Sequence, residues 1–389
     1  MSPTAKTAMI GVAKRAAGIF FLAAVLASAG WLAFERWVAT TELPPLANGH
    51  SVTVLDRDGA LLRAYTVDGG RWRLPVSPDD VDPAYVAALI AYEDKRFYRH
   101  RGVDPWALGR AFRQALVNGR IVSGGSTLTM QVARLLENSG TGRWGPKLRQ
   151  IRMALALERR FSKQRILQLY LERAPYGGNL EGVRAATLSY FGKEPGRLTA
   201  AQRALLVALP QAPESRRPDR HPQAALAARN RVLSRLVAAG ALLADEAEGA
   251  LSEPIPTRRI AFPAMAPHLA DRRVAADPAR PVHRLTLRRA LQVSLERLAR
   301  VHVANKAPGL SAAILVMDHR SGEILASVGS AGFLDRERQG FNDMTRAIRS
   351  PGSTLKPLIY GLAFDAGLAH PETLIDDRPV YTGMVQKVK

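Results

Sequence analysis

The sequence contains no cysteine among its 389 residues. This absence excludes disulfide bonds, thiolate zinc sites and cysteine nucleophiles. Acidic residues are also few, since 34 Asp and Glu stand against 55 Lys and Arg, and the formal net charge is +21. The basic residues are spread along the chain, and an excess of this size indicates a polyanionic partner: nucleic acid, anionic lipid or a phosphorylated substrate.

The sequence shows no internal repeat, which argues against a solenoid or propeller. Hydrophobic residues make up 47% of the chain, so it is not an intrinsically disordered protein. Its length is sufficient for two domains that each bury a core. We therefore expect a multidomain globular protein.

A long uncharged run, AAGIFFLAAVLASAGWLAF, covers residues 16–34. As a helix it reaches about 28 Å, close to the hydrocarbon thickness of a bilayer. Basic residues precede it, whereas Glu35 and Arg36 after it offset each other, so the N-terminus is predicted in the cytoplasm and the bulk of the chain outside. A cleaved signal peptide is the alternative, because ASA at residues 27–29 has the form of a cleavage site.

Export, which both interpretations imply, excludes cytoplasmic nucleic acid as a partner and favours lipid head groups or lipid-linked phosphates. The patterns along the chain then predict five segments: a cytoplasmic tail and transmembrane anchor at 1–40, a stalk and β-hairpin at 41–75, a mainly helical domain at 76–252, a linker rich in Pro, Arg and Ala at 253–300, and a second domain at 301–389. The first hairpin turns at Asp58-Gly59, and a second turns at Ser321-Gly322.

Glu93 has an unusual position at the end of an apolar helical run. Asp82 followed by Pro83 predicts a helix start, and Glu93 falls on the stripe formed by Val86, Leu89 and Ile90. One interpretation is a frayed helix end where the carboxylate pairs with Lys95 or Arg96 in solvent. The other is a partly desolvated carboxylate, which suits a general base.

A second stretch, SGGSTLTMQVARLLE, predicts a helix with Ser126 as its N-cap and leucine and valine on its core side. The opposite stripe is Thr127, Gln131 and Arg134, three side chains that form hydrogen bonds. A helix that starts after glycines presents free N–H groups to an anion. The pattern alone is weak, because many ordinary helices begin in this way.

EDKRFYRHRGVD and GGSTLTMQVAR, followed by ERRFSKQRILQLYLERAPYGGNLEGVRAATLSYFGK and LTAAQRALLVALPQAP, resemble the ordered motifs of the family 51 peptidoglycan glycosyltransferases. SAAILVMDHRSGEILASVGS and SPGSTLKP resemble the beginning of a penicillin-binding transpeptidase domain. Together they resemble class A penicillin-binding proteins of the 1C type. The resemblance implies a lysozyme-like, mainly α glycosyltransferase domain and an incomplete, β-lactamase-like α/β domain.

The resemblance further implies a bacterial inner-membrane enzyme that polymerises lipid II, with Glu93 as the general base. Residues that match family positions for substrate binding are Asp94, Phe97, His100, Ser126, Thr127, Gln131 and Arg134. Arg143 and Lys147 are further candidates for contact with the pyrophosphate. Mg²⁺ or Mn²⁺ is expected as in the family, although no metal-ligand spacing in the sequence indicates it. Other cell-wall synthesis proteins are possible partners.

Two positions depart from the family pattern. Gln150 stands where the family has a second glutamate of the catalytic site, and a glutamine cannot supply negative charge to a metal. Glu172 stands where asparagine is common, and is expected at most to face the cleft. Either this subgroup works without the second carboxylate, or its activity is reduced.

Ser353 and Lys356 have the Ser-x-x-Lys form of a serine nucleophile and its base. The downstream Ser-x-Asn and Lys-Thr-Gly motifs of the family do not occur between Lys356 and Lys389. We therefore expect a truncated, vestigial transpeptidase portion and doubtful β-lactam binding. Two other functions remain open: a non-catalytic scaffold that binds lipid II or cell-wall partners, and a basic, membrane-tethered binder of polyanions.

Overall fold

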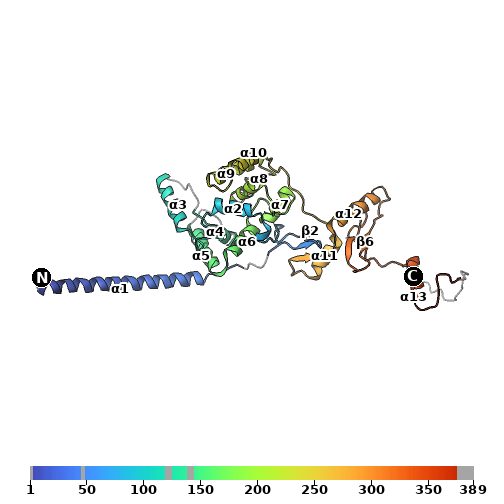
Figure 1. Ribbon diagram of the computed structural model, residues 1–389, viewed down its shortest axis with the longest axis horizontal. Helices are drawn as coiled ribbons and strands as arrows, with labels where there is room; N and C mark the ends of the chain where they lie inside the picture. The colour runs from blue at the N-terminus through green and yellow to red at the C-terminus, as the bar shows by residue number, and fades with distance from the viewer. Residues whose placement is uncertain (1–2, 45–48, 119–124, 138–143, 375–389) are drawn as a thin grey trace.

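The computed structural model describes residues 3–44, 49–118, 125–137 and 144–374, and it is elongated (Figure 1). A long helix, α1 (Pro3–Ala39), projects from a helical body, and a smaller part with strands lies on the far side of that body. Within α1, the 20-residue segment Phe20–Ala39 is long and apolar enough to cross a membrane. The predicted N-terminal apolar helix is therefore present, and it extends beyond residue 34.

The body is built from helices that pack around one large apolar core. In chain order they are α2 (Pro83–Glu93), α4 (Leu128–Glu137), α5 (Trp144–Arg160), α6 (Lys163–Arg173), α7 (Val183–Phe191), α8 (Ala200–Ala208), α9 (Pro222–Ala238) and α10 (Ala244–Ser252), whereas α3 (Pro105–Asn118) contributes no described residue to that core. Two short 3-10 helices, η1 (Pro78–Asp80) and η2 (Leu209–Gln211), precede α2 and follow α8. The paired strands β3 (Trp72–Arg73) and β4 (Leu180–Glu181) lie between helical segments. The mainly helical domain predicted from the sequence is confirmed.

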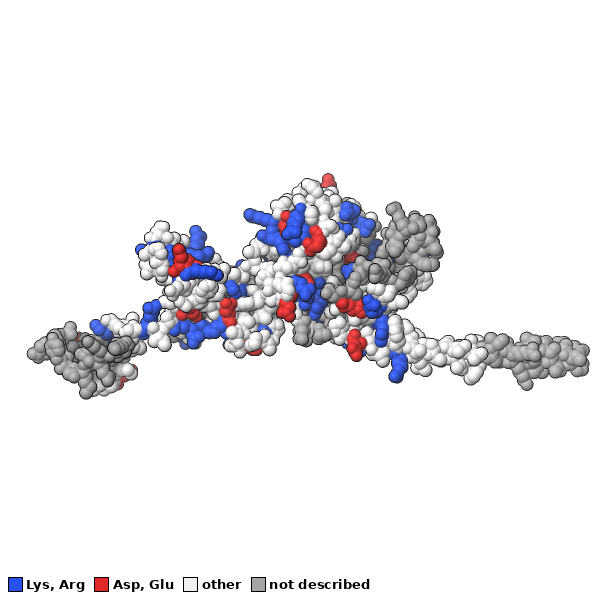
Figure 2. Space-filling view, turned by 180° about the vertical axis from the view of Figure 1, so that it is seen from behind, with Lys and Arg blue, Asp and Glu red and all other residues white. Residues whose placement is uncertain are grey.

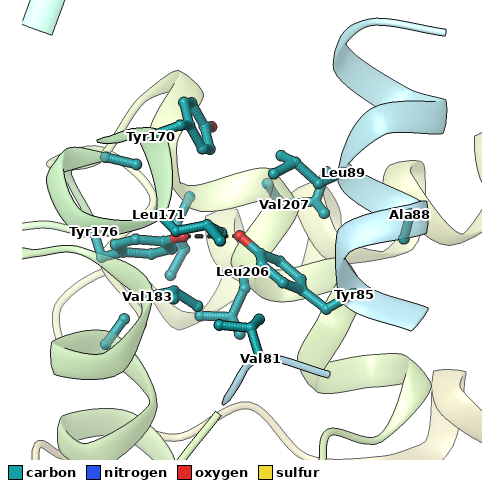
Figure 3. Close-up of a cluster of buried hydrophobic side chains, with 14 of the residues drawn as sticks. Val81, Tyr85, Ala88, Leu89, Tyr170, Leu171, Tyr176, Val183, Leu206 and Val207 are labelled. Carbon is teal, nitrogen blue, oxygen red and sulfur yellow. Dashed lines mark hydrogen bonds between the residues drawn. The ribbon is translucent and has the colours of Figure 1, made fainter. Parts of the chain in front are cut away.

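Helix α2 begins as its sequence predicts. Asp82 is the N-cap and accepts the Ala84 N–H at 2.8 Å, while its other oxygen accepts the Leu198 N–H at 2.7 Å. The predicted inward stripe is displaced, because the fully packed face is Tyr85, Ala88 and Leu89, whereas Val86 and Ile90 are half-buried. The reason is that the bulky Tyr85 occupies the interior, so the helix turns this face to the core (Figure 3).

The hairpin predicted after the stalk is confirmed. Strands β1 (Thr53–Leu55) and β2 (Leu61–Ala64) pair antiparallel, and Asp56 Oδ1 closes the turn by accepting the N–H groups of Asp58 and Ala60. Strand β5 (Val282–Arg284) adds to β1 in parallel and gives the order β2-β1-β5. Part of the predicted 253–300 linker thus belongs to this sheet.

The rest of that linker range is also structured. It contains α11 (Pro267–Ala276) and the start of α12 (Arg289–Ala304), which packs on the hairpin of β6 (Ile314–Met317) and β7 (Ile324–Val328). The Gln292 side chain bonds both the N–H and the carbonyl oxygen of Ser327. The second predicted hairpin is therefore confirmed. The domain boundaries remain predictions, and α12 crosses the one set at residue 300.

The described part of the chain ends with η3 (Gly352–Leu355) and α13 (Lys356–Asp365), at a distance from the body (Figure 1). Neither element contains a buried residue. Large apolar side chains of α13, such as Leu358 and Leu362, are exposed. Within the described residues, this helix packs into no core.

Candidate active site

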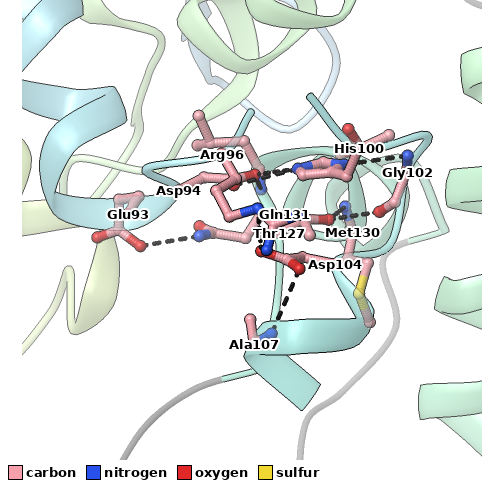
Figure 4. A network of polar contacts seen from close by, with 12 residues as sticks. Glu93, Asp94, Arg96, His100, Gly102, Asp104, Ala107, Thr127, Met130 and Gln131 are labelled. Atoms are coloured by element: carbon pink, nitrogen blue, oxygen red, sulfur yellow. Dashed lines mark hydrogen bonds and ion pairs between the residues drawn. The ribbon is translucent and has the colours of Figure 1, made fainter. Parts of the chain in front are cut away.

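The carboxylate of Glu93, the last residue of α2, is held between two glutamine side chains. Gln131 of α4 donates from Nε2 to Oε2 at 2.9 Å (Figure 4). Gln211 of η2 donates from Nε2 to Oε1 at 2.6 Å. The helix end therefore is not frayed: each oxygen of a half-buried carboxylate accepts one N–H, and each keeps capacity for a further hydrogen bond.

Tyr85, Tyr170 and Tyr176 form a group of buried tyrosines in the core (Figure 3), and the charge of Glu93 acts on two of them. The hydroxyls of Tyr85 and Tyr176 are 2.9 Å apart, and Tyr190 donates to the carbonyl oxygen of Tyr176 at 2.8 Å. Burial raises the pKa of Tyr85 and Tyr170, and the negative charge of Glu93 raises both further. The Glu93 carboxylate thus lies close enough to these buried hydroxyls to disfavour their ionised form.

Asp94 and His100, predicted to bind substrate, are interior residues. Their side chains are only 4% and 2% exposed, and His100 Nε2 lies 2.9 Å from Asp94 Oδ2. The same oxygen accepts the Leu128 N–H at 2.9 Å, which satisfies a free donor at the start of α4 (Figure 4). Direct substrate contact does not fit this burial. Instead, the pair joins the end of α2 to the beginning of α4 and so fixes Glu93 relative to Gln131.

Phe97, also predicted to bind substrate, is an interior residue whose ring is fully buried in the main core. The Nζ of Lys163 lies 4.6 Å from the centre of that ring. Nearby, Gly102 has φ +92°, and a Cβ at this position would come within 2.7 Å of the Ala154 carbonyl oxygen. The loop after α2 therefore lies directly against α5, and only glycine permits this approach.

Helix α4 starts one residue later than predicted, with Thr127 in place of Ser126 as its N-cap. Thr127 Oγ1 accepts the Met130 N–H at 3.1 Å and donates to the Gly102 carbonyl oxygen at 2.6 Å. This leaves Thr127 buried, with no surface for substrate. Ser126 is thereby free of the capping role and is half-buried next to α5.

The cations of the site come from α4 and α5. Lys147 Nζ donates to Ser126 Oγ at 2.5 Å. Burial lowers the pKa of Lys147, and the nearby positive charge of Arg134 lowers it further. Within the described residues, Arg134 has no hydrogen-bond or ion-pair partner. Two neighbouring cations without a carboxylate between them form a site for a polyanion.

The remaining candidates have different positions. Arg143 lies outside the described residues. Gln150 is on α5, three residues after Lys147, and it is buried. Glu172 does not face the cleft, because it is only 1% exposed, with His50 Nε2 3.1 Å from one carboxylate oxygen and Gln168 donating to the other at 3.1 Å.

A metal site held by the protein is not supported in the described ranges, which contain no group of three or more His, Cys, Asp or Glu able to hold an ion. Each oxygen of the Glu93 carboxylate accepts a hydrogen bond from an amide. The Mg²⁺ or Mn²⁺ expected by resemblance therefore stays a prediction. A magnesium ion that keeps most of its waters and binds substrate phosphates would not need such a cluster.

Two residues of the site were missed by the sequence patterns, Gln211 and Arg216. Arg216 Nη1 donates to the side-chain oxygen of Gln211 at 3.0 Å and to the Ala208 carbonyl oxygen at 2.8 Å. The only available signal was a polar residue directly after the apolar run LLVALP. Ser353 and Lys356 are both exposed, at the junction of η3 and α13 and far from Glu93 (Figure 1).

Known proteins are similar to two parts of the chain. Residues 58–237 match the transglycosylase family, and residues 312–388 match the penicillin-binding protein transpeptidase domain. Penicillin-binding protein 1C of Escherichia coli (strain K12) is 43% identical over 355 residues, 91% of this chain and 45% of that protein. Penicillin-binding protein 1B of Vibrio cholerae serotype O1 is 33% identical, over 80% of this chain and 42% of that protein.

The chain thus spans less than half the length of these curated relatives. The crystal structure of penicillin-binding protein 1A from Haemophilus influenzae is 19% identical with a TM-score of 0.33, and the match covers 83% of this chain and 53% of that one. The two family matches occur in the order predicted from the motifs. They and the 43% identity show that the chain belongs to the class A penicillin-binding proteins and is of the 1C type.

Proposed function

We propose that this protein is a membrane-anchored peptidoglycan glycosyltransferase that polymerises lipid II into glycan strands. The observation that carries the proposal is the arrangement around Glu93. Two amides orient its carboxylate, and one of them, Gln131, lies one helical turn before Arg134 on α4, whose positive charge acts on Lys147. A base beside an anion site is what transfer from a glycosyl pyrophosphate requires.

In the proposed reaction Glu93 accepts the proton of the glucosamine 4-hydroxyl of one lipid-linked disaccharide. The hydroxyl oxygen then forms a bond to the anomeric carbon of the growing strand. The bond from that carbon to the undecaprenyl pyrophosphate breaks, and its electron pair leaves with the phosphate oxygen. Attack from the opposite side inverts the anomeric configuration.

The leaving pyrophosphate gains negative charge as the bond breaks. Arg134 and Lys147 offer charge-assisted hydrogen bonds to its oxygens, and Ser126 keeps the Lys147 amine in place. These groups are positioned before the reaction, so they stabilise the transition state without reorganisation. A divalent cation, if required, would bind with the pyrophosphate and add positive charge there.

The proposed location is the bacterial inner membrane, with α1 as a single-pass anchor, its N-terminus in the cytoplasm and the body in the periplasm. The apolar segment Phe20–Ala39 and the similarity to a 1C-type relative support this placement. Lipid II, the growing strand and other cell-wall synthesis proteins are the proposed partners. The body is proposed to have the lysozyme-like fold and residues 301–389 to be part of a β-lactamase-like domain.

The proposal also holds that this chain has no transpeptidase activity. Ser353 and Lys356 are exposed, and no described element forms a wall over them. Incubation of the purified chain with fluorescent penicillin should give no stoichiometric label. Covalent labelling that disappears in Ser353→Ala would contradict this part of the proposal.

The main test is polymerisation of lipid II by the full chain in detergent with Mg²⁺ or Mn²⁺. Glu93→Gln should reduce the rate by about 10²–10⁴-fold, because the amide cannot accept the proton. Glu248→Gln is the matched control, since Glu248 is exposed on α10 and should leave the rate unchanged. Equal rates for wild type and Glu93→Gln would refute the proposed role.

The alternative is a scaffold that binds lipid II without turnover, favoured by Gln150 in place of a second glutamate. This alternative predicts that the wild type binds lipid II but makes no polymer. Gln150→Glu separates the two cases further. If the missing carboxylate limits the reaction, the variant should polymerise faster than the wild type, whereas a scaffold stays inactive.

A further inference from the structure

Gln211 donates to Oε1 of Glu93, the carboxylate oxygen that Gln131 does not bind. It is the last residue of η2, a 3-10 turn that continues α8 directly. The two residues before it, Leu209 and Pro210, are buried, so the backbone that carries Gln211 is fixed against the core. The Gln211 side chain is itself exposed. It is therefore a surface group on a rigid support, aimed at the carboxylate.

Arg216 determines which end of the Gln211 amide faces Glu93. The guanidinium of Arg216 can only donate hydrogen bonds, and its Nη1 lies 3.0 Å from the Gln211 amide oxygen. The amide nitrogen must then point the other way, where it donates to Glu93 Oε1 at 2.6 Å. A second bond, from Arg216 Nη1 to the Ala208 carbonyl oxygen at 2.8 Å, holds Arg216 on the end of α8.

The guanidinium of Arg216 lies close enough to Glu93 for the two charges to interact, but its hydrogen bonds go to Gln211 and Ala208. Burial and the nearby Arg231 lower the pKa of Arg216, while Tyr92 and Glu93 raise it. Direct contact would form an ion pair that occupies the carboxylate oxygens. The Gln211 amide lies between the two groups. Arg216 polarises this amide, which strengthens its hydrogen bond to Glu93, and Glu93 Oε1 keeps a lone pair for a further hydrogen bond.

We infer that Gln211 and Arg216 are positioning residues that hold the Glu93 carboxylate in one orientation for proton transfer. Gln131 fixes one oxygen from α4 and Gln211 fixes the other from η2, so rotation of the carboxylate breaks a bond on either side. A base that is already oriented loses less freedom in the transition state. The inference rests on the proposed glycosyltransferase function.

The experiment compares Gln211→Met and Arg216→Gln with the wild type in the lipid II polymerisation assay. Methionine has a similar length but donates no hydrogen bond. We expect kcat to fall by about tenfold in each variant with KM unchanged, because the interaction orients the base and does not bind substrate.

Matched controls are Gln223→Met and Arg220→Gln, which change the same residue types at exposed positions of the same body. Both should retain wild-type kcat, and all four variants should unfold at the wild-type temperature. A Gln211→Met enzyme with wild-type kcat, or a loss that appears only in KM, overturns the inference and leaves the proposed function intact. An inactive wild type overturns both.

Discussion

Arg152 of α5 contacts Trp37 near the end of α1 in two ways: Nε donates to the Trp37 carbonyl oxygen at 2.8 Å, and the guanidinium carbon lies 5.2 Å from the centre of the indole ring. Arg160 donates to the carbonyl oxygens of Ala39 and Thr41 at 3.1 and 2.8 Å. The carbonyl groups at the end of a helix have no partner within it and carry partial negative charge. Arginines of α5 therefore cap the C-terminus of α1.

This cap predicts that the double variant Arg152→Gln, Arg160→Gln loosens the end of α1. Amide hydrogen exchange at Thr40 and Thr41 should accelerate by about tenfold, which corresponds to roughly 1.4 kcal/mol of lost local stability. Arg149→Gln is the control on the same helix, because Arg149 is exposed. Unchanged exchange in the double variant would show that the cap contributes nothing to the junction.

We expect the substitution of Lys147 to have opposite effects on the stability of the fold and on activity. Its pKa is lowered by burial and by Arg134, so its proton is held less tightly in the folded than in the unfolded protein. Between the lowered pKa and 10.5, stability rises with pH, and at neutral pH the charged amine costs stability. Lys147→Met should therefore raise the unfolding temperature at pH 7 while polymerisation falls. A variant that is both less stable and fully active would contradict the assignment.

The same shift predicts a pH dependence of substrate binding. As pH rises through the lowered pKa, the amine loses its charge and its attraction for the pyrophosphate, so KM should increase on the alkaline side. Lys147→Arg should move this increase to higher pH, because the guanidinium stays protonated. The measurement is KM for lipid II across the alkaline range in both proteins.

Asp94 and His100 predict a large stability effect. Removing one partner of a buried pair leaves the other without compensation, so Asp94→Ala should reduce the free energy of unfolding by about 3 kcal/mol. The start of α4 also loses an acceptor, since Asp94 Oδ2 bonds the Leu128 N–H. Denaturant unfolding of Asp94→Ala, with Glu248→Ala as the exposed control, measures the difference. If Asp94→Ala lowers the free energy of unfolding no more than Glu248→Ala does, the proposed structural role is excluded.

Substitution of Gly102 and of Gly109 by alanine should have opposite effects on stability. Gly102→Ala places a Cβ at 2.7 Å from the Ala154 carbonyl oxygen at φ +92°, and should destabilise the protein by about 1–3 kcal/mol. Gly109 lies in α3 with no atom within 4 Å of its Cβ position, so Gly109→Ala should stabilise by about 0.5–1 kcal/mol. If thermal unfolding shows that both variants change the stability in the same direction, the close approach of the loop to α5 is contradicted.

Sequence signals from neighbouring residues predicted several helix starts and turns of this protein correctly. The Asp82-Pro83 start of α2 and both hairpin turns depend on residues close in sequence, and the structure confirms them. The choice between Ser126 and Thr127 as the cap of α4 could not be made locally. It depends on the Gly102 carbonyl oxygen and on Asp94, which reach the helix start from a distant loop.

The roles of site residues were harder to predict, because a motif does not show which of its members face a cleft. Asp94, Phe97 and His100 follow Glu93 closely, yet the loop turns them into the interior. Gln211 lies 118 positions from Glu93 and meets it only through packing of α8 against α2. Contacts of this kind depend on the tertiary fold, and no spacing in the sequence encodes them.

Helix α5 carries both the Lys147 amine and the two arginines, Arg152 and Arg160, that cap the C-terminal end of α1. Lys147 and Arg152 are five positions apart, about 7.5 Å along the helix axis, and Arg160 lies about 20 Å from Lys147. The C-terminal end of α1 and the proposed pyrophosphate site are therefore both fixed to α5. In the membrane-anchored placement proposed above, α5 sets the height of the site above the head groups, so the phosphates of the proposed lipid-linked substrate meet the cations at a constant depth.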